Sequence, residues 1–538
     1  MPTIARYEVQ IDNALAAHDI IAAAQLAVQA LTFGLKSPLI LNLAAWQREE
    51  ARDFEGARAI LNDALLLSPN DPLLHLSIAT VLRKAGAIRD SLTLLDTLEP
   101  FLADNVAFWL ERAYANEADG MLDCAAADFE LAHQLDLNSV VPLAGLAGVR
   151  SRQRRFGEAR RHAVRVHAVD PSNLTASLAI VRCDLAEGHI DQVKERLIML
   201  LGRTEPVSLE QMTAQSLLGD AFDRMGSAPE AFAAYQVSKQ TYLLLHGHQT
   251  FRQPSHTQFI NRIASEIKAT DDKFWLSRPQ VSPPDYNPHI FLLGYPRSGN
   301  TLVETILVGI EGVTSLEERP TLFDADTRIL LKQGGIAELA RLSLTDINDL
   351  RSAYWRRVEE NCTELRSNAF IDMDPLKSLK LPIIGKLFPD AKILLMQRDP
   401  RDVVWSCFHT NFGFSAAATE FVTLETTARH YAALMALIEL CRSKMALNLF
   451  VVRYESLVSD FDEVTEQICQ FIELPWHSGL RDFDRIAQKR AVRTASAGQV
   501  QRALYDGSGQ WRRYAEYMQP VLPILKPWIE KFGYEVDR

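Results

Sequence analysis

Residues 289–307 read HIFLLGYPRSGNTLVETIL: an apolar run, a loop bounded by Gly294 and Gly299, and an amphipathic stretch. The apolar run predicts a strand and the amphipathic stretch predicts a helix. The glycines permit a tight backbone, so that successive N–H groups and the helix N-terminus converge on an anion. The segment therefore predicts a phosphate cradle.

The cradle differs from the nucleotide-hydrolase pattern GxxxxGK[ST] at one position. The spacing from Gly294 to Gly299 is kept and Thr301 supplies the hydroxyl, but Asn300 stands where that pattern has its lysine. A cation comes earlier instead, at Arg297. A P-loop kinase or nucleotide hydrolase is therefore a weaker alternative, and so is a glycine turn that binds no ligand.

A second segment, AKILLMQRDPRDVVWSCF at residues 391–408, predicts a strand that ends at an arginine and a helix that follows it. Arg398 and Ser406 lie eight positions apart. A guanidinium suits phosphate because its planar fork bonds two oxygens at once. The alternative interpretation is a helix start with surface ion pairs, which contribute little.

Short apolar runs alternate with helix-like stretches throughout this half of the chain. The runs lie at 289–293, 369–371, 391–396 and 449–452. Such alternation predicts a parallel sheet covered by helices, with a ligand site beyond the carboxyl ends of the strands.

Together the two segments, in this order and about a hundred residues apart, resemble the sulfotransferases. The loop sequence PRSG resembles the corresponding loop of the protein-tyrosine sulfotransferase family, which carries an arginine at the same place. The resemblance implies a P-loop-like domain that uses 3'-phosphoadenosine 5'-phosphosulfate, leaves adenosine 3',5'-bisphosphate and needs no metal. It implies that Arg398 and Ser406 hold the 3'-phosphate. Further matches are VVRYESL at 451–457, whose tyrosine lies by the adenosine in the family, and SGQWRRY at 508–514, which covers the cofactor. The implied cofactor-binding residues are Arg297, Ser298, Gly299, Asn300, Thr301, Arg398, Ser406, Tyr454 and Ser508.

The same resemblance implies the catalytic residues. Arg297 would stabilise the leaving group, and a glutamate 21 positions after it would be the base, which is Glu318, with Glu317 as the fallback. Beside cationic phosphate-binding groups we expect this carboxylate to stay ionised. A solvated Glu-Glu-Arg helix start is the alternative, and His409 is a lesser candidate for the base.

One position departs from the family. The run FIDMDP at 370–375 has Met373 where relatives usually carry lysine. Either Lys377 or Lys380 replaces that charge, or turnover is impaired. A repeat scaffold that binds nucleotide without turning it over is therefore a further alternative.

The first half of the chain repeats every 34 residues. Large apolar residues at that step are Phe54, Ile88, Leu122, Phe156 and Ile190, and small ones are Ala45, Ala79, Ala113 and Ala147. Paired helices that pack closely and stack on the next pair need small residues at fixed offsets. The pattern resembles the tetratricopeptide repeat. Such arrays hold partner proteins or extended peptides, so we expect a protein or peptide acceptor or partner here.

The fold prediction is thus an all-α tetratricopeptide-repeat solenoid followed by an α/β P-loop-like sulfotransferase domain with a parallel sheet. The predicted boundaries are 1–240 for the array, 241–285 for a helical segment with a proline-rich linker at 277–285, and 286–538 for the sulfotransferase domain. The prolines of that linker cannot continue a helix.

Composition narrows the functional class. Acidic residues outnumber basic ones, 68 to 57, which argues against nucleic-acid binding as the main activity. No apolar run has the length of a membrane span, and no leader-like N-terminus is present. The six cysteines are scattered, without metal-ligand spacing. We therefore expect a cytoplasmic protein with no membrane or nucleic-acid partner.

Overall fold

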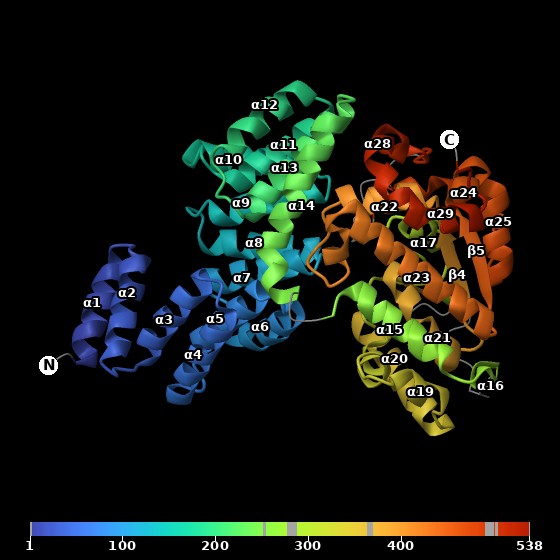
Figure 1. Ribbon diagram of the computed structural model, residues 1–538. Helices are drawn as coiled ribbons and strands as arrows, with labels where there is room; N and C mark the ends of the chain where they lie inside the picture. The colour runs from blue at the N-terminus through green and yellow to red at the C-terminus, as the bar shows by residue number, and fades with distance from the viewer. Residues whose placement is uncertain are drawn as a thin grey trace. The chain divides into compact units, whose positions relative to one another are not determined.

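The computed structural model describes residues 3–250, 254–276, 288–362, 369–489, 500 and 504–536. The chain forms two compact units, Met1–Glu187 and Gly188–Arg538 (Figure 1). The proline-rich linker predicted at 277–285 lies outside the described residues. The predicted domain boundaries at 240 and 286 stay predictions. Among the described helices, none combines the length and the apolar character needed to cross a bilayer.

The first unit consists of helices in which consecutive members pack against each other. They are α1 Ile4–Ala16, α2 Ile20–Thr32, α3 Pro38–Glu50, α4 Phe54–Leu67, α5 Pro72–Lys84, α6 Ile88–Leu102, α7 Val106–Ala118, α8 Leu122–Leu135, α9 Val141–Arg152, α10 Phe156–Val169 and α11 Leu174–Glu187. The large apolar residues of the 34-residue step each begin the second helix of a pair, from Phe54 in α4 to Phe156 in α10. The predicted helical-repeat array is confirmed.

Small residues let the helices of this unit approach closely. Ala45, Ala79, Ala113 and Ala147 are at most 1% exposed. Ser91, three positions after Ile88, is also fully buried, and its hydroxyl donates to the Ala79 carbonyl at 2.8 Å, so this polar side chain has a hydrogen-bond partner inside the array.

Two glycines of α9 give a matched test of this packing. A methyl group on Gly145 would meet the Phe129 ring at 2.4 Å, whereas one on Gly148 would meet only the Thr175 methyl at 3.4 Å. We expect Gly145→Ala to destabilise the first unit by roughly 1–3 kcal/mol through overpacking. Gly148→Ala should be neutral or stabilising by roughly 0.5–1 kcal/mol, because alanine favours helix.

Native-state hydrogen exchange of α8 and α9 in the full chain measures both changes. Equal protection of the two variants would show that Phe129 yields without cost, and would contradict this account of the packing.

The second unit begins with α12 Ile190–Leu201, α13 Leu209–Arg224, α14 Ala228–Thr250, α15 His256–Lys268 and α16 Asp272–Leu276. A sheet of five parallel strands follows, in the order β2-β3-β1-β4-β5. The strands are β1 His289–Leu293, β2 Val313–Glu317, β3 Ala369–Met373, β4 Lys392–Gln397 and β5 Leu449–Arg453. The register sets Leu292 of β1 opposite both Met373 and Leu394. The predicted parallel sheet is confirmed.

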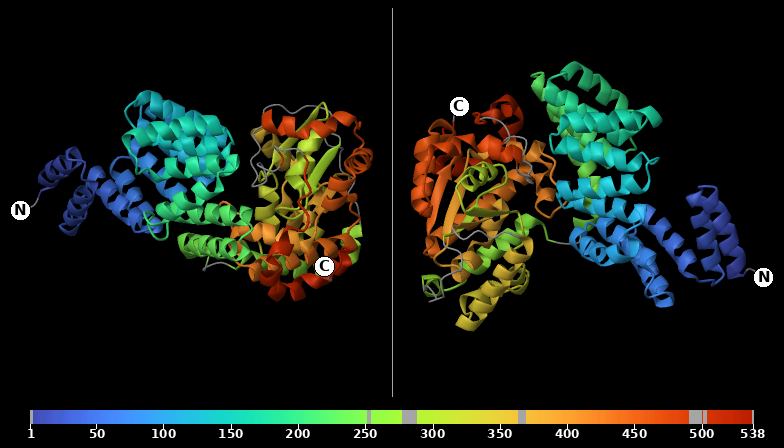
Figure 2. Two further views of the ribbon diagram at one scale, coloured as in Figure 1. Left: turned by 90° about the horizontal axis from the view of Figure 1, so that it is seen from above. Right: turned by 180° about the vertical axis from the view of Figure 1, so that it is seen from behind.

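Helices cover both faces of the sheet, as Figure 2 shows. Phe291 and Leu293 pack in one core with α20, α22 and α23, whereas Ile290 and Leu292 pack in the other with α17 and α25. The longer helices are α17 Asn300–Val308, α20 Leu344–Asn361, α22 Pro400–His409, α23 Leu424–Lys444, α25 Phe461–Ile472 and α29 Leu522–Lys531. The shorter ones are α18 Phe323–Ala325, α19 Gly335–Ala340, α21 Leu381–Leu387, α24 Tyr454–Ser459, α26 Phe483–Lys489 and α28 Ala515–Met518. Between them lie a π turn, Asp326–Leu330, and the 3-10 turns Pro375–Lys380, Ala418–Val422, Ser478–Asp482, Gln510–Tyr514 and Gln519–Val521.

This topology gathers polar side chains at one edge of the sheet. Because all five strands are parallel, their carboxyl ends meet there. The residues that directly follow the strands are Gly294, Glu318, Asp374, Arg398 and Tyr454.

Candidate active site

The loop after β1 has the backbone of an anion cradle. Gly299 has a φ of 104° and caps α17, and its carbonyl accepts from the N–H groups of Leu302 at 3.1 Å and Val303 at 3.2 Å, so the loop leads directly into the N-terminus of the helix. A methyl group on Gly299 would lie 2.9 Å from the Tyr454 ring, so the position admits only glycine. Ser298 N–H closes the turn by donating to the Tyr295 carbonyl at 3.2 Å.

Arg297 and Ser406, predicted from separate segments, are in contact. The Arg297 Nε donates to the Ser406 hydroxyl at 3.0 Å, and Arg297 is 9% exposed. Burial and then the nearby Arg398 lower the pKa of the Arg297 guanidinium, although Cys407 opposes this. Arginine nevertheless stays charged at neutral pH. A second cation therefore lies close to the first in a mostly buried place, which favours an anionic ligand.

Arg398 joins the cradle to the C-terminal segment. Its two Nη atoms donate to the carbonyls of Arg297, at 2.9 Å, and Gly507, at 2.6 Å, and its guanidinium lies 4.5 Å from the centre of the Tyr454 ring. A guanidinium carries five N–H donors. The Nε of Arg398 is buried without a hydrogen-bond partner among the described residues, so capacity remains for a phosphate.

The segment from Gly507 to Tyr514 is fastened to the first turn of α22. Asp402 accepts from the Gly509 N–H at 2.6 Å and from the Trp511 N–H at 3.0 Å. Ser508 is half-buried in this segment, between the carbonyl that contacts Arg398 and the N–H that binds Asp402. The fold thus brings Ser508 to the side of the site that holds Arg398 and Tyr454.

Glu317, the last residue of β2, and Glu318, which follows it, lie in different environments. Glu317 is the last residue of the strand, opposite Met373, and is buried, whereas the Glu318 side chain reaches solvent. Glu318 has a φ of 52°, and its N–H donates to the Met373 carbonyl at 2.7 Å. Arg297 also has a positive φ, 69°. Left-handed backbone in residues other than glycine is costly and collects at functional sites.

Glu318 does not have the ionisation that we expected from the sequence. Desolvation by the surrounding protein, reinforced by Asp374, Glu317 and Glu304, raises the pKa of Glu318 to about 8, while Lys377 opposes the rise. The expectation considered only the cations of the cradle, whereas the folded chain adds three carboxylates. Solvent at the exposed side chain moderates the shift but leaves its upward direction. A base with a pKa raised toward neutrality is well matched to accepting a proton.

His409, the lesser candidate for the base, ends α22. Burial, and then Arg297, lower the pKa of His409 to about 4, so the ring is neutral at pH 7. Its Nδ1 lies 3.0 Å from the Trp405 carbonyl. The ring lines a pocket of about 160 Å³ with Asp223 and Arg513, which form an ion pair at 2.7 Å.

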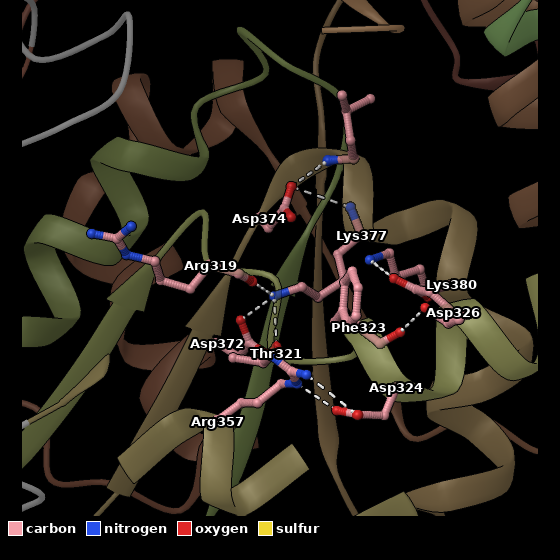
Figure 3. Close-up of polar contacts among 12 residues, drawn as sticks. Arg319, Thr321, Phe323, Asp324, Asp326, Arg357, Asp372, Asp374, Lys377 and Lys380 are labelled. Carbon is pink, nitrogen blue, oxygen red and sulfur yellow. Dashed lines mark hydrogen bonds and ion pairs between the residues drawn. The ribbon is translucent and has the colours of Figure 1, made fainter. Parts of the chain in front are cut away.

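Each lysine that could replace the charge missing at Met373 is paired with an aspartate (Figure 3). Lys377 is fully buried and paired with Asp372, and its Nζ also donates to the Arg319 carbonyl at 3.0 Å and the Thr321 hydroxyl at 3.1 Å. Lys380 is paired with Asp326. Asp372 and Thr321 could not be predicted as site residues from the sequence, since an isolated Asp or Thr carries no motif.

The residues present fit a nucleotide with several phosphate or sulfonate groups. Two cations, Arg297 and Arg398, flank a glycine-lined loop at a helix N-terminus. The amide of Asn300 is 3% exposed and has no hydrogen-bond partner at either polar atom among the described residues, as is true of Arg398 Nε. Buried polar groups without partners are uncommon and are expected where a ligand binds.

Comparison with known proteins agrees with this geometry. Residues 288–478 match the model of the family described as "Sulfotransferase family". An uncharacterised protein of Aquifex aeolicus is 28% identical over 252 residues, which are 45% of this chain and 33% of that protein. Protein-tyrosine sulfotransferase A of Caenorhabditis elegans is 26% identical over 262 residues, 46% of this chain and 68% of its own. The chain thus spans about a third of the first relative and two thirds of the second.

Among solved structures, the sulfotransferase domain of the Synechococcus PCC 7002 olefin synthase covers 48% of this chain and 99% of its own, with 21% identity and a TM-score of 0.31.

Proposed function

We propose that this chain, whose residues 288–478 match the model of the sulfotransferase family, moves a sulfuryl group from 3'-phosphoadenosine 5'-phosphosulfate to a hydroxyl of a protein or peptide tyrosine. The observation that carries the proposal is the pair of buried arginines at a glycine cradle, one of them bonded to the serine eight positions after the other. The identity of the donor and the tyrosine acceptor follow from the likeness to protein-tyrosine sulfotransferases.

Each side chain has a role in this proposal. The bound donor supplies the sulfuryl group and leaves as adenosine 3',5'-bisphosphate. Arg297 lies in the cradle and stabilises the negative charge that develops on the leaving oxygen. The loop residues Ser298 to Thr301 orient the 5' end, while Arg398 and Ser406 hold the 3'-phosphate, Tyr454 borders the adenosine and Ser508 closes over it.

Glu318 accepts the proton of the acceptor hydroxyl as its oxygen bonds to sulfur and the bond from sulfur to the leaving oxygen breaks. Glu317, which is buried one residue away, is the alternative candidate for the base. Positioning and preorganised charge then supply most of the rate, without a metal.

We propose protein or peptide recognition for the repeat array, because stacked helix pairs present extended surfaces. A cytoplasmic location is proposed with it, on the ground that the six cysteines, all of them among the described residues, form no disulfide with one another, which suits a reducing compartment.

Met373 favours a second candidate function, a scaffold that binds nucleotide without turnover. Neither neighbouring lysine has replaced the missing charge in the contacts described above. A kinase has less support, since Asn300 stands in the lysine position of the cradle.

Transfer of radiolabelled sulfate separates the two. The parent and Met373→Lys are given 3'-phosphoadenosine 5'-phosphosulfate and a tyrosine peptide, with the phenylalanine peptide as control. Label on the tyrosine peptide with the parent supports the enzyme, whereas label only with Met373→Lys supports the scaffold. Label with neither, despite bisphosphate binding, contradicts the tyrosine acceptor.

A further inference from the structure

A fully buried ion pair bonds to the turn that contains Glu318, through the Arg319 carbonyl, and has no role in the function proposed so far. Lys377 and Asp372 are both 0% exposed. Moving two charges out of water is unfavourable unless all their hydrogen-bonding capacity is used. Here it is used, because the three N–H groups of Lys377 meet three acceptors, Asp372, the Arg319 carbonyl and the Thr321 hydroxyl.

The partner carboxylate is equally well supported. Asp372 accepts from the Thr321 hydroxyl at 2.7 Å and from the Tyr354 hydroxyl at 3.1 Å. The Tyr354 hydroxyl in turn lies 2.8 Å from His289 Nε2 at the start of β1. The ion pair is therefore tied to β1, β3 and α20.

These contacts converge on the four residues that follow β2. Glu318 N–H is held by the Met373 carbonyl, the Arg319 carbonyl by Lys377, and the Thr321 hydroxyl by both members of the pair. Figure 3 shows Arg319, Thr321, Asp372 and Lys377 meeting at this point. Three successive anchors over four residues explain how Glu318, which is not glycine, keeps a φ of 52°.

We infer that the Asp372–Lys377 ion pair is a positioning device for Glu318, holding the turn after β2 so that this carboxylate faces the reacting hydroxyl. The lysine acts through the Arg319 carbonyl and does not touch the donor. This gives Lys377 a role other than the one expected of it, replacement of the charge at Met373. As a catalytic statement, the inference rests on the proposed function.

The position of the cation has an electrostatic consequence too. Among the groups with the largest influence on the pKa of Glu318, only Lys377 lowers it. Burial and the neighbouring carboxylates raise it. Removing the cation should therefore move the titration of Glu318 to higher pH, which a purely structural role would not do.

The test uses the double variant Lys377→Met/Asp372→Asn, which keeps the side-chain sizes and leaves no unpaired buried charge. Lys380→Met is the matched control, because Lys380 lies in the same 3-10 turn and is also paired with an aspartate, Asp326, without bonding to residues 318–321. Thr321→Val is a milder variant that removes only the bridging hydroxyl.

Hydrogen exchange of the peptide spanning residues 316–321 is measured in the full chain. We expect at least tenfold loss of protection in the double variant, a smaller loss in Thr321→Val and no change in Lys380→Met. Unchanged protection in the double variant would overturn the inference whether or not the chain transfers sulfate.

Turnover provides the second measurement. A misplacement of about 1 Å can cost about 100-fold in rate, so the double variant should lose 10- to 100-fold in kcat, with bisphosphate affinity within threefold and the pH midpoint raised. An unchanged kcat would overturn the inference. If the parent itself neither binds bisphosphate nor transfers sulfate, the proposed function fails, while the exchange result still decides whether the pair holds the turn.

Discussion

Arg297→Ala is expected to lower kcat for sulfuryl transfer by about 10²- to 10³-fold, the loss typical of removing one preorganised charge stabiliser. The reason is the place of this side chain, mostly buried in the cradle and bonded to Ser406, where its charge is little screened by water. Single-turnover kinetics with saturating donor measure the effect on the chemical step.

Two variants serve as controls for Arg297. Arg297→Lys keeps a charge but loses the planar fork, and should recover only part of the rate. Arg429→Ala removes an exposed arginine paired with Glu425 on α23 and should leave kcat unchanged. Turnover of Arg297→Ala within threefold of the parent would show that the leaving group is stabilised elsewhere.

Glu318→Gln is expected to lower kcat by about 10²- to 10⁴-fold, the range for loss of a general base. In the parent, kcat should rise with pH through the raised pKa of Glu318, about 8, and level off only above it, because only the ionised form accepts the proton. The variant should lose this rise. A pH profile of kcat for both proteins measures it, with Glu317→Gln as the matched control.

The same residue makes a prediction about stability that needs no turnover. A carboxyl whose pKa is raised on folding stabilises the fold fully below its unfolded pKa and loses that contribution as pH rises through the folded value. The stability of the parent should therefore fall between about pH 5 and pH 8 relative to Glu318→Gln, which cannot ionise. Parallel unfolding midpoints for the two proteins across that range would contradict the raised pKa.

In the pH profile of kcat, loss of the rise in Glu317→Gln and not in Glu318→Gln would identify Glu317 as the base.

Sequence alone predicted the elements whose signals are local. The strand, glycine loop and helix at 289–308 and the strand before Arg398 stand out because buried parallel strands are continuous apolar runs. β2 was missed, since VTSLE has only two large apolar residues and lies at the edge of the sheet, paired on one side. The strand that carries Glu317 therefore had no signal of its own.

The environment of Glu318 could not be predicted for a different reason. Its pKa depends on Asp374 after β3, Glu304 in α17 and Lys377 in a 3-10 turn, which only the fold brings together.

The turns of the helical array were also hidden in the sequence. The turns between paired helices need a left-handed residue every 34 positions, which is glycine at 86 and 120 but arginine at 52 and 154, so composition alone hides the rule.

Calorimetry of adenosine 3',5'-bisphosphate, AMP and ADP binding to the parent and to Arg398→Ala tests the central claim, that this site holds a nucleotide with a 3'-phosphate. One charge-assisted contact contributes roughly 1.5–3 kcal/mol, or about 10- to 150-fold in affinity. We predict that the parent prefers the bisphosphate by that factor over AMP and ADP, and that Arg398→Ala loses the preference. Equal affinity for the three ligands, or preference for ADP, would contradict the account.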